Sequence, residues 1–363
     1  MARGVRIVGA ALALGLMAAA CGEDSSTDVV NSASGFPAQR CDANKDAGQI
    51  TFLTSFDYAA AASIIDVVAA DAQGYFKAVC LDVKLQPGFS SDNVATVASG
   101  KAQMTSLGSF SEVAVANTQG ADLVAIGVEG HTSIEELLVE NSANITQLKQ
   151  LEGRSVGIKG AIPYSLRAML AEAGVDESKL KEIEVDFNPV TLFETEIDAL
   201  PVYKSNEPGQ LDAQGYAGKY HAFDPQESDI PASFAVFTTS AKFARDHPTA
   251  AADFLRASLK GFEWAAANPE AAVETTLKRS DPKLFFNPDG EKFRWDTERK
   301  LVADSTPEGR PVGWIDADQL AREAEALVTI GAVKAGEVDA AKSYDDRFIK
   351  EVTAGSRVAW FES

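Results

Sequence analysis

Four short segments of the chain each contain an aromatic ring and a hydroxyl group, two of them also contain a carboxylate, and three contain glycine or proline. This set is suited to holding a small molecule. The segments are residues 54–58, 106–110, 160–165 and 203–208. Aromatic rings stack on flat ligands, and hydroxyls and carboxylates hydrogen-bond to polar atoms of a ligand. Glycine lets the backbone approach a ligand where a Cβ atom would obstruct it. The chemistry that these segments suggest is therefore binding.

The side chains of these segments supply the candidate ligand-binding residues. Rings that could stack on a planar ligand or enclose an apolar one are Phe56, Tyr58, Tyr164 and Tyr203. Carboxylates that could accept hydrogen bonds from a cationic or amino-bearing ligand are Asp57, Glu207 and, outside the segments, Glu194. Small residues that complete the predicted site are Ser55, Gly108, Ser109, Gly160, Ala161 and Ser165. The alternative is that the rings belong to the core, the carboxylates are solvated and the turns are ordinary connections.

Reactive side chains and catalytic motifs are scarce in this chain. The sequence has no G-x-S-x-G, HExxH, CxxC or phosphate-binding GxxxxGK[ST] motif. Its histidines are His131, His221 and His247, and with three cysteines they leave little material for a metal site. We therefore predict no catalytic residue, no metal and no cofactor.

The composition is that of a folded, acidic protein. The 363 residues are 45% hydrophobic and 24% charged, which excludes a disordered or collagen-like chain. Lys and Arg number 33 against 53 Asp and Glu, so the net charge is −20. A nucleic-acid surface needs clustered basic residues, and that class of partner is excluded. The length exceeds what one compact core usually holds, which predicts two lobes.

The N-terminus has the pattern of an export signal. Arg3 and Arg6 precede an uncharged stretch over residues 7–20, shorter than the roughly 20 residues that span a bilayer. Residues 1–20 are therefore predicted to be a signal peptide. The stretch ends in Ala-Ala-Ala-Cys-Gly, which resembles the lipobox of bacterial lipoproteins. The resemblance implies that Cys21 is lipidated and anchors the protein to the outer face of the cell membrane. The alternative is a plain secretory signal with an incidental cysteine.

The residues that follow Cys21 are small, polar and acidic, a composition that cannot bury enough apolar surface to fold. Residues 21–41 are therefore predicted to be a flexible tether. The other two cysteines, Cys41 and Cys80, each precede a predicted strand. Adjacent parallel strands would bring both to one edge of a sheet, and an exported compartment permits them to pair. We predict a disulfide between Cys41 and Cys80.

The elements that must position the candidate site alternate between strands and helices. The first set has strands at 49–54, 81–85, 103–107 and 123–127, with helices at 59–73, 92–99 and 110–119. The second set has strands at 136–140, 155–158, 183–185 and 199–203, with helices at 145–148, 164–173 and 190–196. From residue 235 the chain is alanine-rich, with helices at 249–267, 269–278, 290–303, 317–330 and 344–353.

This alternation implies an α/β protein with mainly parallel sheets covered by helices. Ligands of such proteins bind beyond the carboxyl ends of the strands, where helix N-termini offer unpaired N–H groups. The four segments follow predicted strands, so they are expected at this edge.

Seven stretches of sequence, taken in order, resemble one family of proteins. They are Gly-Tyr-Phe at 74–76, Leu-Asp-Val at 81–83, Pro-Gly at 87–88, Ser-Gly-Lys-Ala-Gln at 99–103, Leu-Glu-Gly-Arg-Ser-Val-Gly at 151–157, Ile-Asp-Ala at 197–199 and His-Pro at 247–248. Together they resemble the solute-binding proteins of ABC importers for nitrate, sulfonates, taurine and thiamine pyrimidine precursors. The resemblance covers residues 48–270.

The resemblance implies a two-lobed type II periplasmic-binding-protein fold with two crossing segments and the C-terminal helices on the first lobe. The crossings are expected near residues 127–136 and 229–236. The first lobe would comprise residues 42–130 and 236–363, and the second lobe residues 131–235.

The function that the resemblance implies is the capture of a small molecule between two lobes and its delivery to an ABC permease. The protein would be a monomeric extracytoplasmic lipoprotein without a nucleic-acid partner. Carboxylates among the candidates disfavour nitrate and sulfonates, which need hydrogen-bond donors and positive charge. They favour a small nitrogen heterocycle, such as a thiamine pyrimidine precursor.

Two alternatives belong to other functional classes. Thiamine pyrimidine synthases resemble these binding proteins but use a lysine, a histidine and an iron-binding cysteine cluster. The corresponding positions here are Leu107, Ser111 and residues 229–233, which contain no cysteine. A sensor lipoprotein with the same fold would instead signal to another membrane protein. The residues favour the binding protein of an importer.

Overall fold

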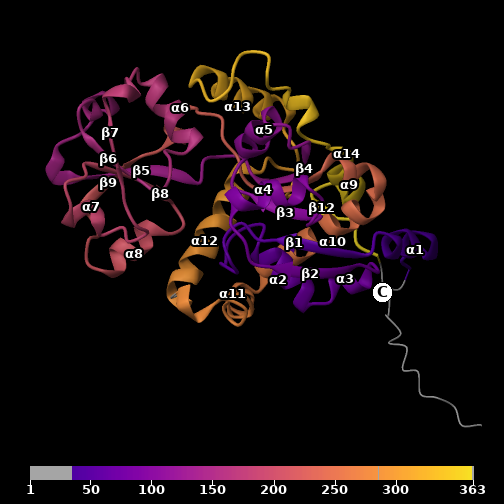
Figure 1. The fold of residues 1–363 in the computed structure, drawn as a ribbon. Coiled ribbons are helices and arrows are strands. Elements are labelled where there is room, and N and C mark those ends of the chain that lie inside the picture. The colour runs from indigo at the N-terminus through magenta and orange to yellow at the C-terminus, as the bar shows by residue number, and fades with distance from the viewer. Residues whose placement is uncertain (1–34, 285, 362–363) are drawn as a thin grey trace, which may run out of the picture. The chain divides into compact units, whose positions relative to one another are not determined.

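The structure is a computed structural model that describes residues 35–284 and 286–361 (Figure 1). One of its sheets has five strands in the order β2-β1-β3-β10-β4, and we call it the first sheet. Its strands are β1 (Gln49–Leu53), β2 (Asp82–Gln86), β3 (Met104–Leu107), β4 (Leu123–Gly130) and β10 (Phe234–Ser240). β1 pairs in parallel with β2 and β3, whereas β10 runs antiparallel between β3 and β4.

Helices cover both faces of the first sheet, because neighbouring strand residues point to opposite faces and most are apolar. Phe52 packs into one apolar cluster and Leu53 into another. Helices that contribute to the first cluster are α1 (Ala38–Asp46), α2 (Ile65–Ala72), α3 (Tyr75–Ala78), α9 (Ala241–Asp246), α10 (Pro248–Ala267) and α14 (Arg347–Val352). Helices that contribute to the second are α4 (Ser90–Ala98), α5 (Phe110–Thr118) and α13 (Ala317–Thr329).

The helix α10 is placed by its alanines, its first proline and one glycine. Pro248 stands in the first turn, where its missing N–H leaves no bond unmade. Gly261 faces α2, and a Cβ atom there would collide with the carbonyl oxygen of Asp66. The close approach of these two helices therefore requires glycine at this position.

The second sheet also has five strands, in the order β7-β6-β8-β5-β9. They are β5 (Glu135–Glu140), β6 (Ser155–Ile158), β7 (Lys181–Glu184), β8 (Ala199–Tyr203) and β9 (Tyr220–Phe223). β6 is parallel to β7 and β8, and β5 is antiparallel to β8 and β9. Its helices are α6 (Tyr164–Glu172), α7 (Thr191–Glu194) and α8 (Glu207–Ala213).

Two connections join the sheets, one from β4 to β5 and one from β9 to β10. The chain after β10 returns to the first sheet through α9 and α10. It continues with α11 (Pro269–Leu277) and α12 (Pro288–Ser305), and a short hairpin of β11 (Thr353–Ala354) and β12 (Arg357–Val358) follows α14. Two five-stranded sheets covered by helices and linked twice confirm the predicted α/β fold. The division into lobes at residues 130 and 235 stays a prediction.

Several predicted elements were wrong in detail. The sheets are mainly parallel as expected, but each contains one antiparallel strand that was not predicted to be so, β10 in the first sheet and β5 in the second. The strand β9 and the helices α8 and α9 were not predicted. The helix predicted over 59–73 begins only at Ile65. Residues 59–64 are held in a turn by carboxylates from elsewhere in the chain, which is described below.

The predicted tether ends earlier than expected. Phe36 is buried, with its ring 4.7 Å from that of Phe361, and α1 carries Cys41 into the first apolar cluster. The flexible segment predicted over 21–41 therefore does not extend through residues 36–41. The signal peptide and Cys21 lie outside the described residues. Within the part of the chain that the structure describes, no helix is long and apolar enough to cross a membrane.

The expected disulfide joins Cys41 to Cys80, with their Cα atoms 5.2 Å apart. It ties α1 to the turn before β2 and closes a loop between residues 39 positions apart in sequence. We expect a Cys41→Ser/Cys80→Ser double variant to lose about 2–4 kcal/mol of unfolding free energy, because the unfolded chain loses a constraint. Urea denaturation followed by circular dichroism measures this loss.

The control for the disulfide prediction is reduction of the native protein. Dithiothreitol should lower the stability of the unsubstituted chain by a similar amount and leave the double variant unchanged. A double variant as stable as the oxidised parent would show that the bond adds nothing to stability.

Candidate functional site

The turn after β3 and the beginning of α6 come together, although they belong to different sheets. Tyr164 at the start of α6 packs against the second apolar cluster of the first sheet. Arg167 on α6 donates a hydrogen bond to the carbonyl oxygen of Ile330, which follows α13, at 3.0 Å. Two of the segments singled out in the sequence therefore meet at the junction of the two sheets.

Three carboxylates lie at this junction, and we call Glu112, Glu135 and Glu323 the acidic triad. Glu323 on α13 accepts hydrogen bonds from the N–H and the hydroxyl of Ser111, both at 2.8 Å. Glu135 at the start of β5 accepts a hydrogen bond from the Ser165 hydroxyl at 2.9 Å. The triad thus joins α5, α13, β5 and α6.

Glu112 occupies the space that Gly108 leaves open. A Cβ atom at position 108 would collide with Glu112 Oε1, so a side chain there would displace the carboxylate from its place over the start of α5. The backbone N–H of Gly108 and the hydroxyl of Ser90 favour the charged form of Glu112. Gly108, predicted to contact a ligand, hence makes room for a carboxylate that the sequence analysis missed.

The acidic triad is hard to ionise fully. Burial is the largest cause that raises the pKa of Glu112 to about 7, and the charge of Glu135 adds to it. Burial likewise raises the pKa of Glu323 to about 7, with a further contribution from Glu135. The pKa of Glu135 is also raised by burial, which hydrogen bonds from Ser165 and Ser133 partly offset. Around neutral pH the triad therefore holds both protons and negative charge.

Tyr203 faces the same region from the end of β8. Its side chain is 44% exposed, yet desolvation by the surrounding protein is the largest cause that raises its pKa, followed by the charges of Glu135 and Glu112. The ring is thus partly exposed and still lies among protein groups that include these carboxylates. Desolvation also raises the pKa of Tyr164, followed by the charge of Glu112.

Glu207 was predicted to accept hydrogen bonds from a ligand, but in the structure its carboxylate contacts other groups of the protein. It is buried, forms an ion pair with Lys159 and accepts the backbone N–H of Tyr203 at 2.9 Å. The Lys159 ammonium also lies 5.7 Å from the ring of Phe187, which is 69% exposed. Glu207 therefore positions the backbone of Tyr203.

The turn after β1 is built differently from the prediction. Asp57 is 6% exposed and accepts the backbone N–H of Asp281 at 3.2 Å, and the hydroxyl of Tyr58 donates to the carbonyl oxygen of Leu85 at 3.1 Å. The ring of Phe56 lies 5.7 Å from that of Phe89 and 5.8 Å from that of Phe286. These side chains, with the half-buried Ser55, hold neighbouring loops, and no described contact joins them to the acidic triad.

The remaining candidates are more scattered. Gly160 has a φ of 92°, which favours glycine, and with the exposed Ala161 it forms the turn that leads into α6. Glu194 ends α7 and is exposed, and among the described residues no hydrogen bond or ion pair connects it to the other candidates. Its role as a ligand stays a prediction.

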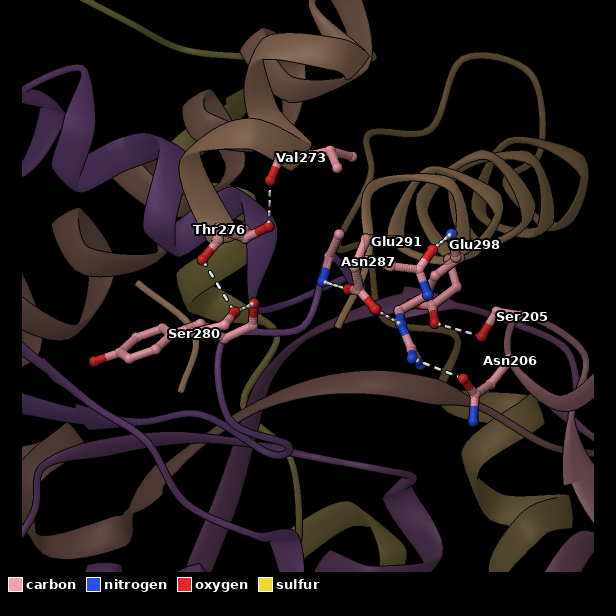
Figure 2. A network of polar contacts seen from close by, with 12 residues as sticks. Ser205, Asn206, Val273, Thr276, Ser280, Asn287, Glu291 and Glu298 are labelled. Carbon is pink, nitrogen blue, oxygen red and sulfur yellow. Dashed lines mark hydrogen bonds and ion pairs between the residues drawn. The ribbon is translucent and has the colours of Figure 1, made fainter. Parts of the chain in front are cut away.

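The helix α12 bridges the two sheets through a polar network (Figure 2). Glu291 and Glu298 accept the backbone N–H groups of Ala60 and Ala62, at 2.6 and 2.7 Å. Glu298 also accepts the hydroxyl of Ser205 at 2.7 Å. Arg294, between the two glutamates on the same helix, donates to the side-chain oxygen of Asn206 at 2.8 Å. One helix thus fixes the turn after β1 and holds the turn after β8.

A fully buried carboxyl pair, Asp66 and Glu129, lies beside this network. Glu129 accepts the backbone N–H of Ser63 at 2.8 Å, while both oxygens of Asp66 and the second oxygen of Glu129 have no ordinary donor in the described structure. A proton on Glu129 that is shared with Asp66 accounts for one oxygen of each residue. Burial raises the pKa of Asp66 to about 7, and burial followed by the Asp66 charge raises that of Glu129 well above its usual range.

Sequence reasoning missed the acidic triad because its members are far apart in the chain and two are on surface-like helices. A signal was available for the buried pair, since Asp66 and Glu129 each interrupt an otherwise apolar run. Charged residues are almost never fully buried unless they are paired, so an acid inside such a run indicates a tertiary partner.

Other features do not form a competing site. A surface pocket of about 270 Å³ is lined by Gly100, Gln103, Lys242 and His247 among others, and by none of the predicted ligand-binding residues. Among the described residues there is no group of three or more His, Cys, Asp or Glu side chains arranged to hold a metal ion.

The sequence of the chain is similar to one protein family and to two proteins named as binding proteins. The family described as NMT1/THI5 like matches residues 61–272. The riboflavin-binding protein RibY of Chloroflexus aurantiacus is 23% identical over 299 residues, which cover 77% of this chain and 80% of the relative. The formylaminopyrimidine-binding protein of Halalkalibacterium halodurans is 25% identical over 219 residues, which cover 58% of this chain and 65% of the relative.

Solved structures share the fold at low sequence identity. The periplasmic aliphatic sulphonate binding protein SsuA from Escherichia coli superposes with a TM-score of 0.62 and 14% identity, covering 86% of this chain and 96% of SsuA. The desulfurization enzyme DSZB superposes with a TM-score of 0.55 and 14% identity, covering 83% of this chain and 98% of the enzyme. Binding proteins and an enzyme thus share this architecture.

The buried carboxyl pair predicts an unusual dependence of stability on pH. A carboxyl group whose pKa is raised on folding favours the folded state at low pH, and this contribution is lost as the pH rises through the folded-state pKa. For Asp66 the window runs from about 4 to about 7. The parent should lose this stability as the pH rises, whereas Asp66→Asn should not. The unfolding free energy of Asp66→Asn minus that of the parent should therefore increase by a few kcal/mol from pH 4 to pH 8.

Urea denaturation at several pH values measures this difference. The control is Glu182→Gln, at an exposed position on β7, which should follow the parent at every pH. A constant difference between Asp66→Asn and the parent across the range would contradict the raised pKa.

Proposed function

The chain belongs to the NMT1/THI5-like family, and from this premise we propose that it is an extracytoplasmic solute-binding protein of an ABC importer. It would capture a small molecule between two lobes, built on the first and second sheets, and deliver it to a permease. The observation that carries the proposal is the meeting of the turn after β3, the start of α6 and the exposed ring of Tyr203 at the junction of the sheets.

The proposed ligand is a small nitrogen heterocycle. The acceptor-rich surroundings of Tyr203 suit a ligand that donates hydrogen bonds, as the amino group of an aminopyrimidine does. The ring itself can stack on a flat ligand. The names of the two relatives, which bind riboflavin and formylaminopyrimidine, point to the same chemical class.

The proposed mechanism is closure of the lobes over the ligand. The contacts of Ser205 with Glu298 and of Asn206 with Arg294 link the turn after β8 to α12. A ligand that binds more tightly to the closed form shifts the population toward it, and a permease can then recognise that form.

We propose binding and not catalysis as the activity. Both ring nitrogens of His131 have partners, the side-chain oxygen of Gln319 and the carbonyl oxygen of Trp314, each at 3.1 Å. Ser111, which corresponds to the synthase histidine, is committed to Glu323. The likeness to DSZB concerns the fold and brings no reactive group with it.

Tyr203 should carry much of the affinity. We expect Tyr203→Ala to weaken binding of formylaminopyrimidine or riboflavin, whichever binds the parent, by about tenfold, because a stacked aromatic pair contributes roughly 1 kcal/mol beyond its buried area. Tyr203→Phe, which keeps the ring, should retain most of the affinity. Isothermal titration calorimetry measures both, with ethanesulfonate as a third ligand.

Two results would contradict the proposal. One is binding of ethanesulfonate without binding of either heterocycle. The other is small-angle scattering that shows no compaction of the protein at a saturating concentration of ligand.

We further propose that the mature protein is a lipoprotein attached through Cys21. Cys21→Ser should release the protein from the membrane fraction into the soluble extracytoplasmic fraction, because the lipid supplies the anchor. Immunoblots of fractionated cells measure the distribution, and Cys41→Ser/Cys80→Ser is the control that keeps Cys21. Retention of Cys21→Ser in the membrane fraction would contradict lipid anchoring.

A further inference from the structure

We propose that the acidic triad holds a positively charged group of the ligand, an ammonium or a protonated ring nitrogen. The inference rests on the proposed function, since it places the ligand at the junction of the sheets. It goes beyond that function by naming the charge of the group that is recognised and the three carboxylates Glu112, Glu135 and Glu323 that recognise it.

The first argument is the absence of a compensating cation. Among the described residues, no Lys or Arg forms an ion pair with any member of the triad, whereas Glu207 has Lys159 and Glu291 has Arg294. Lys204 lowers the pKa of Glu135, and its ammonium donates to the carbonyl oxygen of Ser133 at 2.9 Å and pairs with Asp224. Three carboxylates from separate elements thus share a buried place without a directly paired cation, which is costly unless something else supplies positive charge.

The second argument is an oxygen without a partner. Glu323 is 3% exposed, and its Oε1 receives both hydrogen bonds from Ser111. Its Oε2 is buried and has no hydrogen-bond partner in the described structure. The hydroxyl of Ser233 lies close enough to lower the pKa of Glu323, but no hydrogen bond of normal length reaches Oε2. A buried acceptor that lacks a donor is rare in folded proteins. The ammonium of a ligand is one donor that would satisfy it.

The third argument concerns the starts of α5 and α6, each of nine residues. Helix N-termini normally attract anions through their free N–H groups and partial positive charge. Here carboxylates of the protein lie at both helix starts. Glu323 takes the N–H of Ser111 and Glu112 lies against Gly108, while Glu135 takes the hydroxyl of Ser165. An anionic ligand would meet negative charge where it needs donors, and a cation would meet acceptors.

The fourth argument is the aromatic surroundings. The charges of Glu135 and Glu112 raise the pKa of Tyr203, and the charge of Glu112 raises that of Tyr164. Both rings therefore lie near the triad. The face of an aromatic ring attracts a cation within about 6 Å. Rings and carboxylates together form the kind of wall that binds an organic cation.

The test uses two probes that differ in one charged group. They are 4-amino-2-methylpyrimidine with a 5-aminomethyl group, an ammonium at pH 7.5, and the same ring with a neutral 5-hydroxymethyl group. We expect the full-length protein to bind the ammonium probe at least tenfold more tightly in isothermal titration calorimetry. Glu323→Gln and Glu112→Gln should each reduce this preference about tenfold, since each removes one charge-assisted contact.

The matched control is Glu325→Gln, an exposed position on the same helix α13, which should leave the preference unchanged. Binding of the ammonium should also release protons, because Glu112 and Glu323 have pKa values near 7 and Glu135, which faces both, has a raised pKa. Affinity should therefore rise between pH 6 and pH 8, and the binding enthalpy should depend on the ionisation enthalpy of the buffer.

The outcomes separate this inference from the proposed function. Equal or tighter binding of the hydroxymethyl probe would overturn the inference and leave heterocycle binding intact. A preference for the ammonium that survives both glutamine substitutions would also overturn it, because the charge would be recognised elsewhere. Binding of neither probe would overturn the inference, and if riboflavin and formylaminopyrimidine failed as well, the proposed function would fall with it.

Discussion

The structure depends on carboxylates that later helices bring to the turns at the ends of early strands. Glu291 and Glu298 on α12 accept the N–H groups of Ala60 and Ala62 after β1. Glu323 on α13 accepts the N–H of Ser111 after β3. A buried N–H without a partner costs about as much as a lost hydrogen bond, so each turn takes its shape only when its carboxylate is in place. The C-terminal helices are therefore part of the site.

The same contacts explain where the negative charge of this protein matters. A net charge of −20 by itself says little about a binding site, because most of the acids face solvent. The acidic triad and the pair of Asp66 and Glu129 are different, since burial raises their pKa values and no basic side chain is paired with them among the described residues. Local charge at the junction of the sheets therefore bears more on the proposed ligand than the total charge does.

Proteins with this fold have different activities, so the activity has to be inferred from the side chains of the site. SsuA and DSZB share the architecture, one as a sulphonate-binding protein and the other as an enzyme. In this chain, glutamates accept the N–H of Ser111 at the start of α5 and the hydroxyl of Ser165 at the start of α6.

The sequence alone determined the class of fold, most of the strands and the part of the chain that would carry the site. Apolar periodicity and the order of turns are local properties, and they predicted β1, β3, β6 and β8 and the segments that follow them. Gly108, Tyr164, Ser165 and Tyr203 were identified in this way, and the structure places them at or around one junction.

Only the tertiary structure decided which carboxylates serve that junction. Asp57 and Glu207 have the right chemistry but are used to hold Asp281 and Lys159. Glu112, Glu135 and Glu323 come from helices and a strand that sequence reading treated as scaffold. The physical reason is that a carboxylate acquires its role from the donors and charges packed around it. Those neighbours lie up to about two hundred residues away, as Ser111 and Glu323 do with a separation of 212.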